Sequence, residues 1–236
     1  MIAVLGCLAS TLSIAVVWPQ VWRSCRHRRT LGLSPTSAWL AVGLNVCWLT
    51  FGALTGDPAQ MITNGVVGTG NSAVLVALLL TQPRLRTRGV LLRTAAGAAG
   101  LLALAVGSAL SVTMFGASPA VVATTLSSVI AVVGSVAALP QPLRLLRDRT
   151  QDVSGLSPTR WRLGAGACAS WTSYGWLGHQ PAVSLGAGFG LTCAVLMCAL
   201  LRSRTAQPAG PRRPARPAVA VIPGPRMPAR SALIAA

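Results

Sequence analysis

The sequence has few charged residues and almost none of negative sign. Asp, Glu, Lys and Arg make up 10% of its 236 residues, against about 25% in an ordinary soluble domain. Lys and Glu are absent, and the acids are Asp57, Asp148 and Asp152. Hydrophobic residues make up 53%, and the mean hydropathy is +0.62. This composition argues against a soluble globular protein.

All 20 basic residues are Arg, and the formal net charge is +17. A charge of this size would fit nucleic-acid binding if it covered one surface. The Arg residues instead fall in four bunches that long uncharged stretches separate. Such bunches are typical of membrane topology, so we expect a lipid bilayer and no nucleic acid as a partner.

The six Cys residues contain no CxxC pair, and five of them lie in apolar runs. His27 and His179 are far from any Cys in the sequence, and every acid lies outside the apolar runs. A disulfide framework or a zinc site is therefore not expected. A Ser, His and acid combination is equally unsupported, so the sequence predicts no enzyme, no metal and no cofactor.

Seven apolar runs are long enough to cross a bilayer core, which takes about 20 helical residues. Their expected bounds are 2–22, 34–55, 59–81, 91–113, 118–140, 161–178 and 181–201. The first run is followed, not preceded, by Arg residues, so we expect it to stay in the mature protein rather than be removed as a signal peptide.

The Arg bunches follow runs one, three, five and seven, and the loops after runs two, four and six contain no Arg. Because cytoplasmic loops carry the positive charge, the N-terminus is expected outside and the C-terminus in the cytoplasm. The exclusive use of Arg suggests a GC-rich bacterial genome and hence the plasma membrane. The Pro- and Arg-rich stretch 203–236 is expected to be a disordered cytoplasmic tail that can touch anionic lipid headgroups.

The chain contains an internal duplication. Pro-Gln occurs at the end of run one and again at the end of run five, and each Arg-rich loop then closes with GLSPT, at 32–36 and 155–159. A shift of 123 residues next aligns Trp48 with Trp171, Phe51 with Tyr174, and Pro58 with Pro181. Each copy holds three spans, and both Pro-Gln loops are basic, so one extra span must separate them.

This doubled pattern resembles the SWEET and PQ-loop transporter family. The resemblance implies an all-α membrane protein with two parallel three-helix repeats joined by a linker helix, a 3+1+3 arrangement with a pseudo-twofold axis along the membrane normal. The expected parts are a first repeat over 1–82, a basic loop and linker helix over 83–117, a second repeat over 118–202, and the tail.

Polar groups within the spans are the candidate solute site, because they are costly in a membrane unless they face a cavity or a partner. Asn45 and Trp48 share one helix face, as do Asn64 and Asn71, and Trp48 and Asn64 reach similar depth. In SWEET-like proteins a Trp and an Asn at such positions line the central cavity, which implies Trp48, Asn64 and Trp171 here. The second copy has Ala187 and Cys168 at the positions of Asn64 and Asn45, so a symmetric two-Asn site is not available.

The resemblance also implies moving parts. Pro19 and Pro140 should kink their helices near the cytoplasmic end and act as hinges, with Gln20 and Gln141 beside them at the cytoplasmic mouth. Asp57 matches the family's outer-gate acid, although the partner Arg found in some members is missing. Phe51 and Tyr174 would be the aromatic plugs of that gate.

The predicted function is facilitated diffusion of a small neutral solute, with a sugar favoured, by alternating access between the repeats. An indole suits the C–H face of a sugar ring, and an Asn amide suits its hydroxyls. Two alternatives stay open: an amino-acid exporter of the PQ-loop type, and a non-transporting receptor or assembly factor with the same fold.

Overall fold

The computed structural model describes residues 1–31, 33–148 and 158–205, and these form helices and no strand. Seven long helices match the seven expected runs: α1 Ile2–Cys25, α2 Pro35–Thr55, α3 Pro58–Thr81, α4 Arg88–Thr113, α5 Pro119–Ala138, α7 Pro158–Leu177 and α8 Pro181–Thr205. Two short helices, η1 Pro83–Arg86 and α6 Pro140–Arg147, follow α3 and α5. The expected tail lies outside the described residues from position 206 onward.

Six helices are long and apolar enough to cross a membrane, with α5 and α6 counted together as Pro119–Arg147. The remaining expected span, 161–178, forms α7. This helix has the length but does not reach the same hydropathy, since it carries Arg160, Arg162 and several small polar residues. The inner face of α7 is buried at Ser170 and Tyr174, where it packs against α1 and α8. Ser170 and Tyr174 are therefore accommodated by contact with protein.

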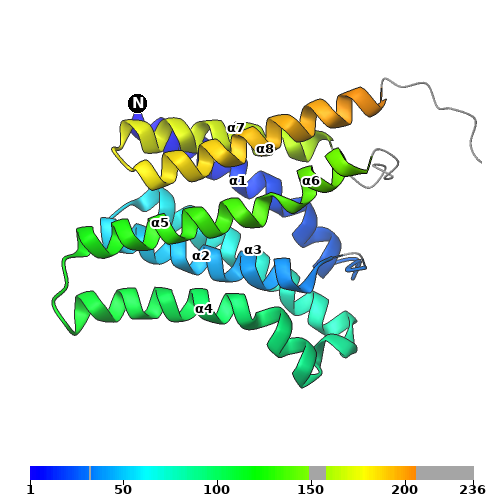
Figure 1. Ribbon diagram of the computed structural model, residues 1–236, viewed down its shortest axis with the longest axis horizontal. Coiled ribbons are helices and arrows are strands. Elements are labelled where there is room, and N and C mark those ends of the chain that lie inside the picture. The colour runs from blue at the N-terminus through cyan, green and yellow to red at the C-terminus, as the bar shows by residue number, and fades with distance from the viewer. Residues whose placement is uncertain (32, 149–157, 206–236) are drawn as a thin grey trace, which may run out of the picture.

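The helices lie side by side, with α7 and α8 at one edge of the view in Figure 1 and α4 at the other. Within the first copy, α3 packs against α1 and α2, and within the second copy, α8 packs against α5 and α7. Between the copies, α1 packs against α7 and α5 packs against α2. The contacts of one copy are thus repeated by the equivalent helices of the other.

The α2–α3 connection positions one end of the site. Helix α2 ends at Thr55 and is capped by Gly56. The φ of Gly56 is 66°, a left-handed conformation that suits Gly. Asp57 follows, and its side chain accepts a hydrogen bond from the backbone N–H of Gln60, so it caps α3. Pro58 then occupies the first turn, where a missing N–H costs nothing.

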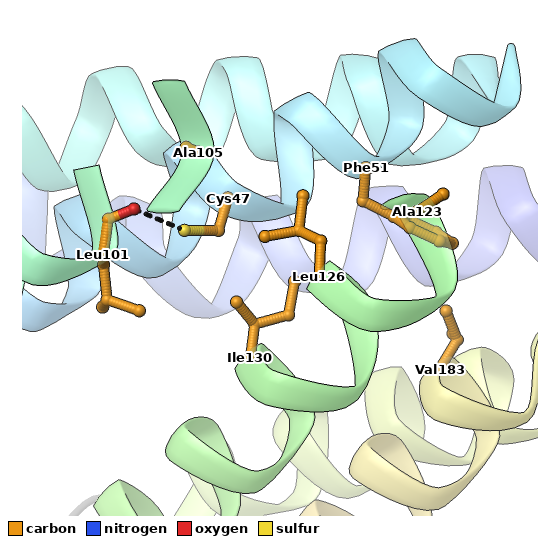
Figure 2. Packing of buried hydrophobic residues seen from close by; sticks show 8 residues of the cluster. All are labelled: Cys47, Phe51, Leu101, Ala105, Ala123, Leu126, Ile130 and Val183. Atoms are coloured by element: carbon orange, nitrogen blue, oxygen red, sulfur yellow. Dashed lines mark hydrogen bonds between the residues drawn. The ribbon is translucent and has the colours of Figure 1, made fainter. Parts of the chain in front are cut away.

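A buried apolar cluster joins the first copy, α4 and the second copy. Figure 2 shows its eight residues, which come from α2, α4, α5 and α8: Cys47, Phe51, Leu101, Ala105, Ala123, Leu126, Ile130 and Val183. The Cys47 thiol donates a hydrogen bond to the Leu101 carbonyl oxygen at 3.1 Å, which ties α2 to α4. Burial of this cluster holds α4 against α2 and α5.

Gly175 marks a close approach of α7 and α8, and Gly52 marks the equivalent approach of α2 and α3. A Cβ atom on Gly175 would lie 2.7 Å from the Ser184 backbone nitrogen, and one on Gly52 would lie 3.0 Å from the Met61 nitrogen. Backbone atoms cannot move aside as a flexible side chain can. The shift of 123 residues also aligns Gly52 with Gly175, and these contacts explain why Gly occupies both positions.

Replacing Gly175 by Ala is therefore expected to destabilise the protein by about 1–3 kcal/mol through overpacking. Thermal unfolding of the purified protein in detergent micelles measures the effect. Gly164→Ala is the matched control in the same helix, because a Cβ at Gly164 would meet nothing within 4 Å. An equal loss of stability in both variants would contradict the close α7–α8 approach.

Candidate functional site

A cavity of about 280 Å³ lies between the two copies, bounded by α1, α2, α3, α5, α7 and α8. Its lining residues are Ser13, Asn45, Trp48, Gln60, Thr63, Asn64, Val67, Ile130, Ala131, Gly134, Ser135, Cys168, Trp171, Val183, Gly186 and Ala187. Along α3 the lining runs from Gln60 to Val67, about 10 Å at the helical rise. Val67 is nine residues into α3, so the cavity reaches roughly the middle of a bilayer core about 30 Å thick.

Four of the five predicted solute-site residues line this one cavity: Asn45, Trp48, Asn64 and Trp171. Asn71 is not among the lining residues, although it shares a helix face with Asn64. One turn from Val67, α1 closes on α3, where a Cβ on Gly70 would lie 3.1 Å from Val21. On α3 the cavity lining ends at Val67, one turn before Asn71.

The two copies contribute equivalent positions of opposite character. The first copy supplies five polar side chains, here called the polar wall: Ser13, Asn45, Gln60, Thr63 and Asn64. The equivalent positions of the second copy, here called the apolar wall, are Gly134, Cys168, Val183, Gly186 and Ala187. Gly134 follows Ser13 by 121 residues, the offset between Pro19 and Pro140, and the members of the other four pairs are 123 residues apart. Ser135 adds one hydroxyl to the lining from the second copy. Trp48 and Trp171 are the equivalent pair that stays the same.

Three polar-wall residues were not predicted from the sequence. Gln60 lies four residues before Asn64, and Thr63 lies four residues before Val67, so all of them share one face of α3. That spacing could have predicted both residues as part of the site from the sequence. Ser13 is one of three hydroxyl residues in the first apolar run, and nothing in the sequence distinguishes it from Ser10 or Thr11.

Hydrogen bonds hold the polar wall in place. The Asn64 side-chain NH₂ donates to the Gln60 backbone oxygen at 2.9 Å and to the Gln60 side-chain oxygen at 3.0 Å. The Asn45 NH₂ donates to the Ala41 backbone oxygen at 2.8 Å. The Asn45 side-chain oxygen is buried and accepts no hydrogen bond in the described part of the chain. Such a buried acceptor is costly until a donor reaches it.

The two tryptophans frame the cavity with matching aromatic pairs. Trp48 packs edge-to-face on Phe51 with ring centroids 5.5 Å apart, and Trp171 packs in the same way on Tyr174 at 5.3 Å. The Trp171 indole N–H donates to the Ser13 hydroxyl at 3.1 Å, which links the copies. Gly134 stands at the position equivalent to Ser13 and has no side chain to accept from Trp48.

At one end of the bundle, Asp57 joins the α2–α3 connection to the α7–α8 connection. Its carboxylate accepts hydrogen bonds from the Tyr174 hydroxyl at 2.8 Å and from the Gln180 NH₂ at 3.0 Å. Asp57 is 5% exposed and Tyr174 is 7% exposed. We call Asp57, Tyr174 and Gln180 the Asp57 cluster.

The members of the Asp57 cluster relate to the duplication in an uneven way. Gln180 is the equivalent of Asp57 in the second copy, 123 residues further on, and the sequence analysis missed it. Phe51, which is the equivalent of Tyr174, has no hydroxyl and lies in the buried apolar cluster instead. Of the three residues predicted for an outer gate, Asp57 and Tyr174 are brought into contact, and Phe51 packs beside Trp48.

The two Pro-Gln pairs lie in different local structures. Helix α1 continues through Pro19 to Cys25, and the Gln20 NH₂ donates to the buried Ser24 hydroxyl at 2.8 Å. In the second copy, α5 ends at Ala138 and α6 begins at Pro140, next to Gln141. The second GLSPT segment lies outside the described residues up to Ser157. The helix of the second copy is therefore interrupted next to Pro140, whereas the helix of the first copy continues through Pro19.

The chain is similar to known proteins in part of its sequence and in its fold. Residues 1–61 match the model of the PQ loop repeat family. No curated protein sequence matches the chain. The fold is similar to the structure of a eukaryotic SWEET transporter, with a TM-score of 0.66 and 18% identity, over 87% of this chain and 97% of that one. The predicted resemblance is confirmed for the PQ-loop repeat in residues 1–61, and the resemblance to a SWEET transporter is confirmed in the fold.

Proposed function

We propose, from the PQ-loop repeat in residues 1–61 and the SWEET fold, that this multi-pass membrane protein is a transporter. Its solute is a small neutral molecule, and a sugar is favoured. The solute crosses the membrane by facilitated diffusion. The cavity between the copies is the solute site, with Asn45, Trp48, Asn64 and Trp171 as its binding residues.

The observation that carries this proposal is the chemistry of the cavity. No Arg, Asp or His lies among the described residues that line it. Amide and hydroxyl groups on one side face two indole rings, a combination that suits hydroxyls and the C–H surface of a sugar ring. Its volume of about 280 Å³ lies just below the range of about 300–1,000 Å³ common for small-molecule sites. A free carboxylate or ammonium group would enter with no counter-charge.

Alternating access follows from the way the copies meet. In the 3+1+3 arrangement, residues 1–82 and 118–202 are the moving repeats, and 83–117, with α4, links them. The Asp57 cluster closes the outer end by joining the two repeats. Pro19 and Pro140, with Gln20 and Gln141, are the hinge positions at the cytoplasmic end, where a proline removes a backbone hydrogen bond.

Uptake into proteoliposomes is the experiment that tests this function. The purified protein is reconstituted and offered radiolabelled sugars and amino acids in parallel, with protein-free liposomes as the control. Uptake of a sugar supports the proposal. Uptake of amino acids alone supports an exporter of the PQ-loop type, and the absence of any uptake favours a receptor or assembly role.

The orientation gives a separate expected result at Cys25, which is exposed after the first span. The assay uses a variant in which Cys7, Cys168 and Cys198 are replaced by Ala, because Cys47 and Cys193 are buried. A membrane-impermeant thiol reagent should label Cys25 in inverted vesicles and not in intact cells. Labelling in intact cells would reverse the proposed orientation, in which the N-terminus is outside.

We expect transport to be uncoupled from protons, because the cavity offers no titratable Asp or His among its described residues. Vesicles loaded with equal solute inside and outside are given a pH gradient. A uniporter should produce no net accumulation. Accumulation that a protonophore abolishes would contradict uniport and make Asp57, three residues from Gln60, the first residue to mutate.

A further inference from the structure

The contrast between the polar wall and the apolar wall bears on which solute the cavity holds. At five equivalent positions the first copy has a hydrogen-bonding side chain, and the second copy has Gly, Ala, Val or Cys. The duplication would by itself give two walls of the same kind. The hydrogen-bonding side chains therefore gather on one side of this cavity, with the Ser135 hydroxyl as the exception on the other side, although the aromatic pair, Trp48 and Trp171, is symmetric.

The polar wall can bind a row of hydroxyl groups. It presents the amides of Asn64 and Gln60, and the Thr63 hydroxyl, which donates to the Ser10 hydroxyl at 2.6 Å, can still accept a hydrogen bond. A solute edge with several hydroxyls exchanges its water for these groups at little cost.

The apolar wall cannot do the same. Ala187, Val183 and Gly186 have no side-chain donor or acceptor, and the thiol of Cys168 is a weak one. Ile130, also part of the buried apolar cluster, continues this surface. A hydroxyl that faces this wall loses water and gains no partner, which is enough to weaken binding about tenfold or more. A hydrogen or methyl group in its place is well accommodated.

We propose that the cavity selects a sugar with hydroxyls on one edge and an apolar group on the opposite edge, which is the chemistry of a deoxy sugar, rather than a fully hydroxylated hexose. This inference rests on the proposed transport function. The polar wall binds the hydroxylated edge, the apolar wall packs on the deoxy position, and Trp48 and Trp171 cover the ring from either side.

The test compares matched sugar pairs that differ by one hydroxyl. D-glucose is paired with 6-deoxy-D-glucose and with 2-deoxy-D-glucose, and L-mannose with L-rhamnose, in wild-type proteoliposomes. At least one deoxy partner should be transported with a kcat/KM at least tenfold above that of its hydroxylated counterpart. If the members of every pair are transported equally, or the hydroxylated member is better, the selectivity is wrong and the transport function stands. If no sugar is transported, both fail.

Restoring a polar group to the apolar wall gives a second arm. Ala187→Asn places an amide opposite Asn64, and Cys168→Ser is a smaller change that keeps the size of the side chain. Either variant should reduce the preference for the deoxy sugar by about tenfold, by improving transport of the hydroxylated one. Thr192→Asn, on the exposed face of α8, is the control and should leave the preference unchanged. A preference that stays at the wild-type value in both wall variants, with both proteins folded by thermal unfolding, would overturn the inference.

Discussion

Replacing Trp48 or Asn64 by Ala is expected to lower solute uptake by tenfold or more. Each side chain lines the cavity between the two copies. Loss of a buried hydrogen bond to a solute hydroxyl costs about 1–3 kcal/mol, and loss of the indole removes the flat apolar surface under the ring. Initial rates of uptake in proteoliposomes, corrected for the amount of folded protein, measure the effect.

Asn71→Ala is the matched control for Asn64→Ala. It removes the same group from the same helix and the same face, and Asn71 lies beyond the cavity. Uptake by this variant should stay within about twofold of the wild type, because exposed or peripheral substitutions change little. Loss of uptake at Asn71, with Trp48→Ala silent, would place the solute site elsewhere in the bundle.

Removal of the Asp57 carboxylate should also reduce uptake at least tenfold, by preventing closure of one end. In Asp57→Ala the Tyr174 hydroxyl and the Gln180 amide lose their shared acceptor. Each buried donor left without a partner costs about 1–3 kcal/mol. The state in which the two connections meet is then disfavoured, and the outer end stays open. Uptake rates and thiol labelling of Cys168 from the outer side, which should become faster, together measure this shift.

Asp57→Asn separates the charge from the hydrogen bonds. The Asn oxygen can still accept from Tyr174, and its NH₂ can donate to the Gln180 side-chain oxygen, which is buried without a partner in the wild type. We expect this variant to keep more uptake than Asp57→Ala. Equal loss in both variants would assign the effect to the charge and not to the contact between the copies.

The sequence predicted the helices and most of the cavity because the duplication fixed the register of both copies. Trp48, Asn64 and Trp171 could be assigned from their equivalent positions and from their depth. Asn71 could not be separated from Asn64, since residues seven apart share a helix face. The cavity lining on α3 ends at Val67, one turn before Asn71. How far the cavity extends along the helix depends on tertiary packing and not on helical period.

The Asp57 cluster was predicted in part for a similar reason. Asp57 and Tyr174 were both identified, but as plugs of a gate with Phe51 as an equal member. A periodic pattern treats Phe51 and Tyr174 alike. Their surroundings differ because only Tyr174 has a hydroxyl to reach Asp57, and Phe51 is buried against α4 and α5. Gln180 lies within the repeated stretch, but it differs in type from Asp57, so residue identity did not mark it; its position equivalent to Asp57 could have identified it.

The expected span 161–178 shows that hydropathy alone does not identify every helix of this bundle. The run 161–178 forms α7, yet its composition does not reach the hydropathy of the other six spans. Its polar residues include Ser170, which is buried and bonded to the Gly166 backbone oxygen at 2.9 Å. A helix that packs against protein on its polar side does not need the composition of one that lipid surrounds.

Thiol labelling of Cys168 from each side of the membrane tests the central claim, that the cavity between the copies is a solute site open alternately to the two sides. Cys168 lines the cavity, and Cys47 and Cys193 are buried, so only Cys7, Cys25 and Cys198 need replacement by Ala. A small impermeant methanethiosulfonate should label Cys168 in right-side-out and in inverted vesicles, and a transported sugar should slow both reactions. A Cys168→Ala variant controls for other sites. Labelling from one side only, or labelling that the sugar leaves unchanged, would contradict alternating access at this cavity.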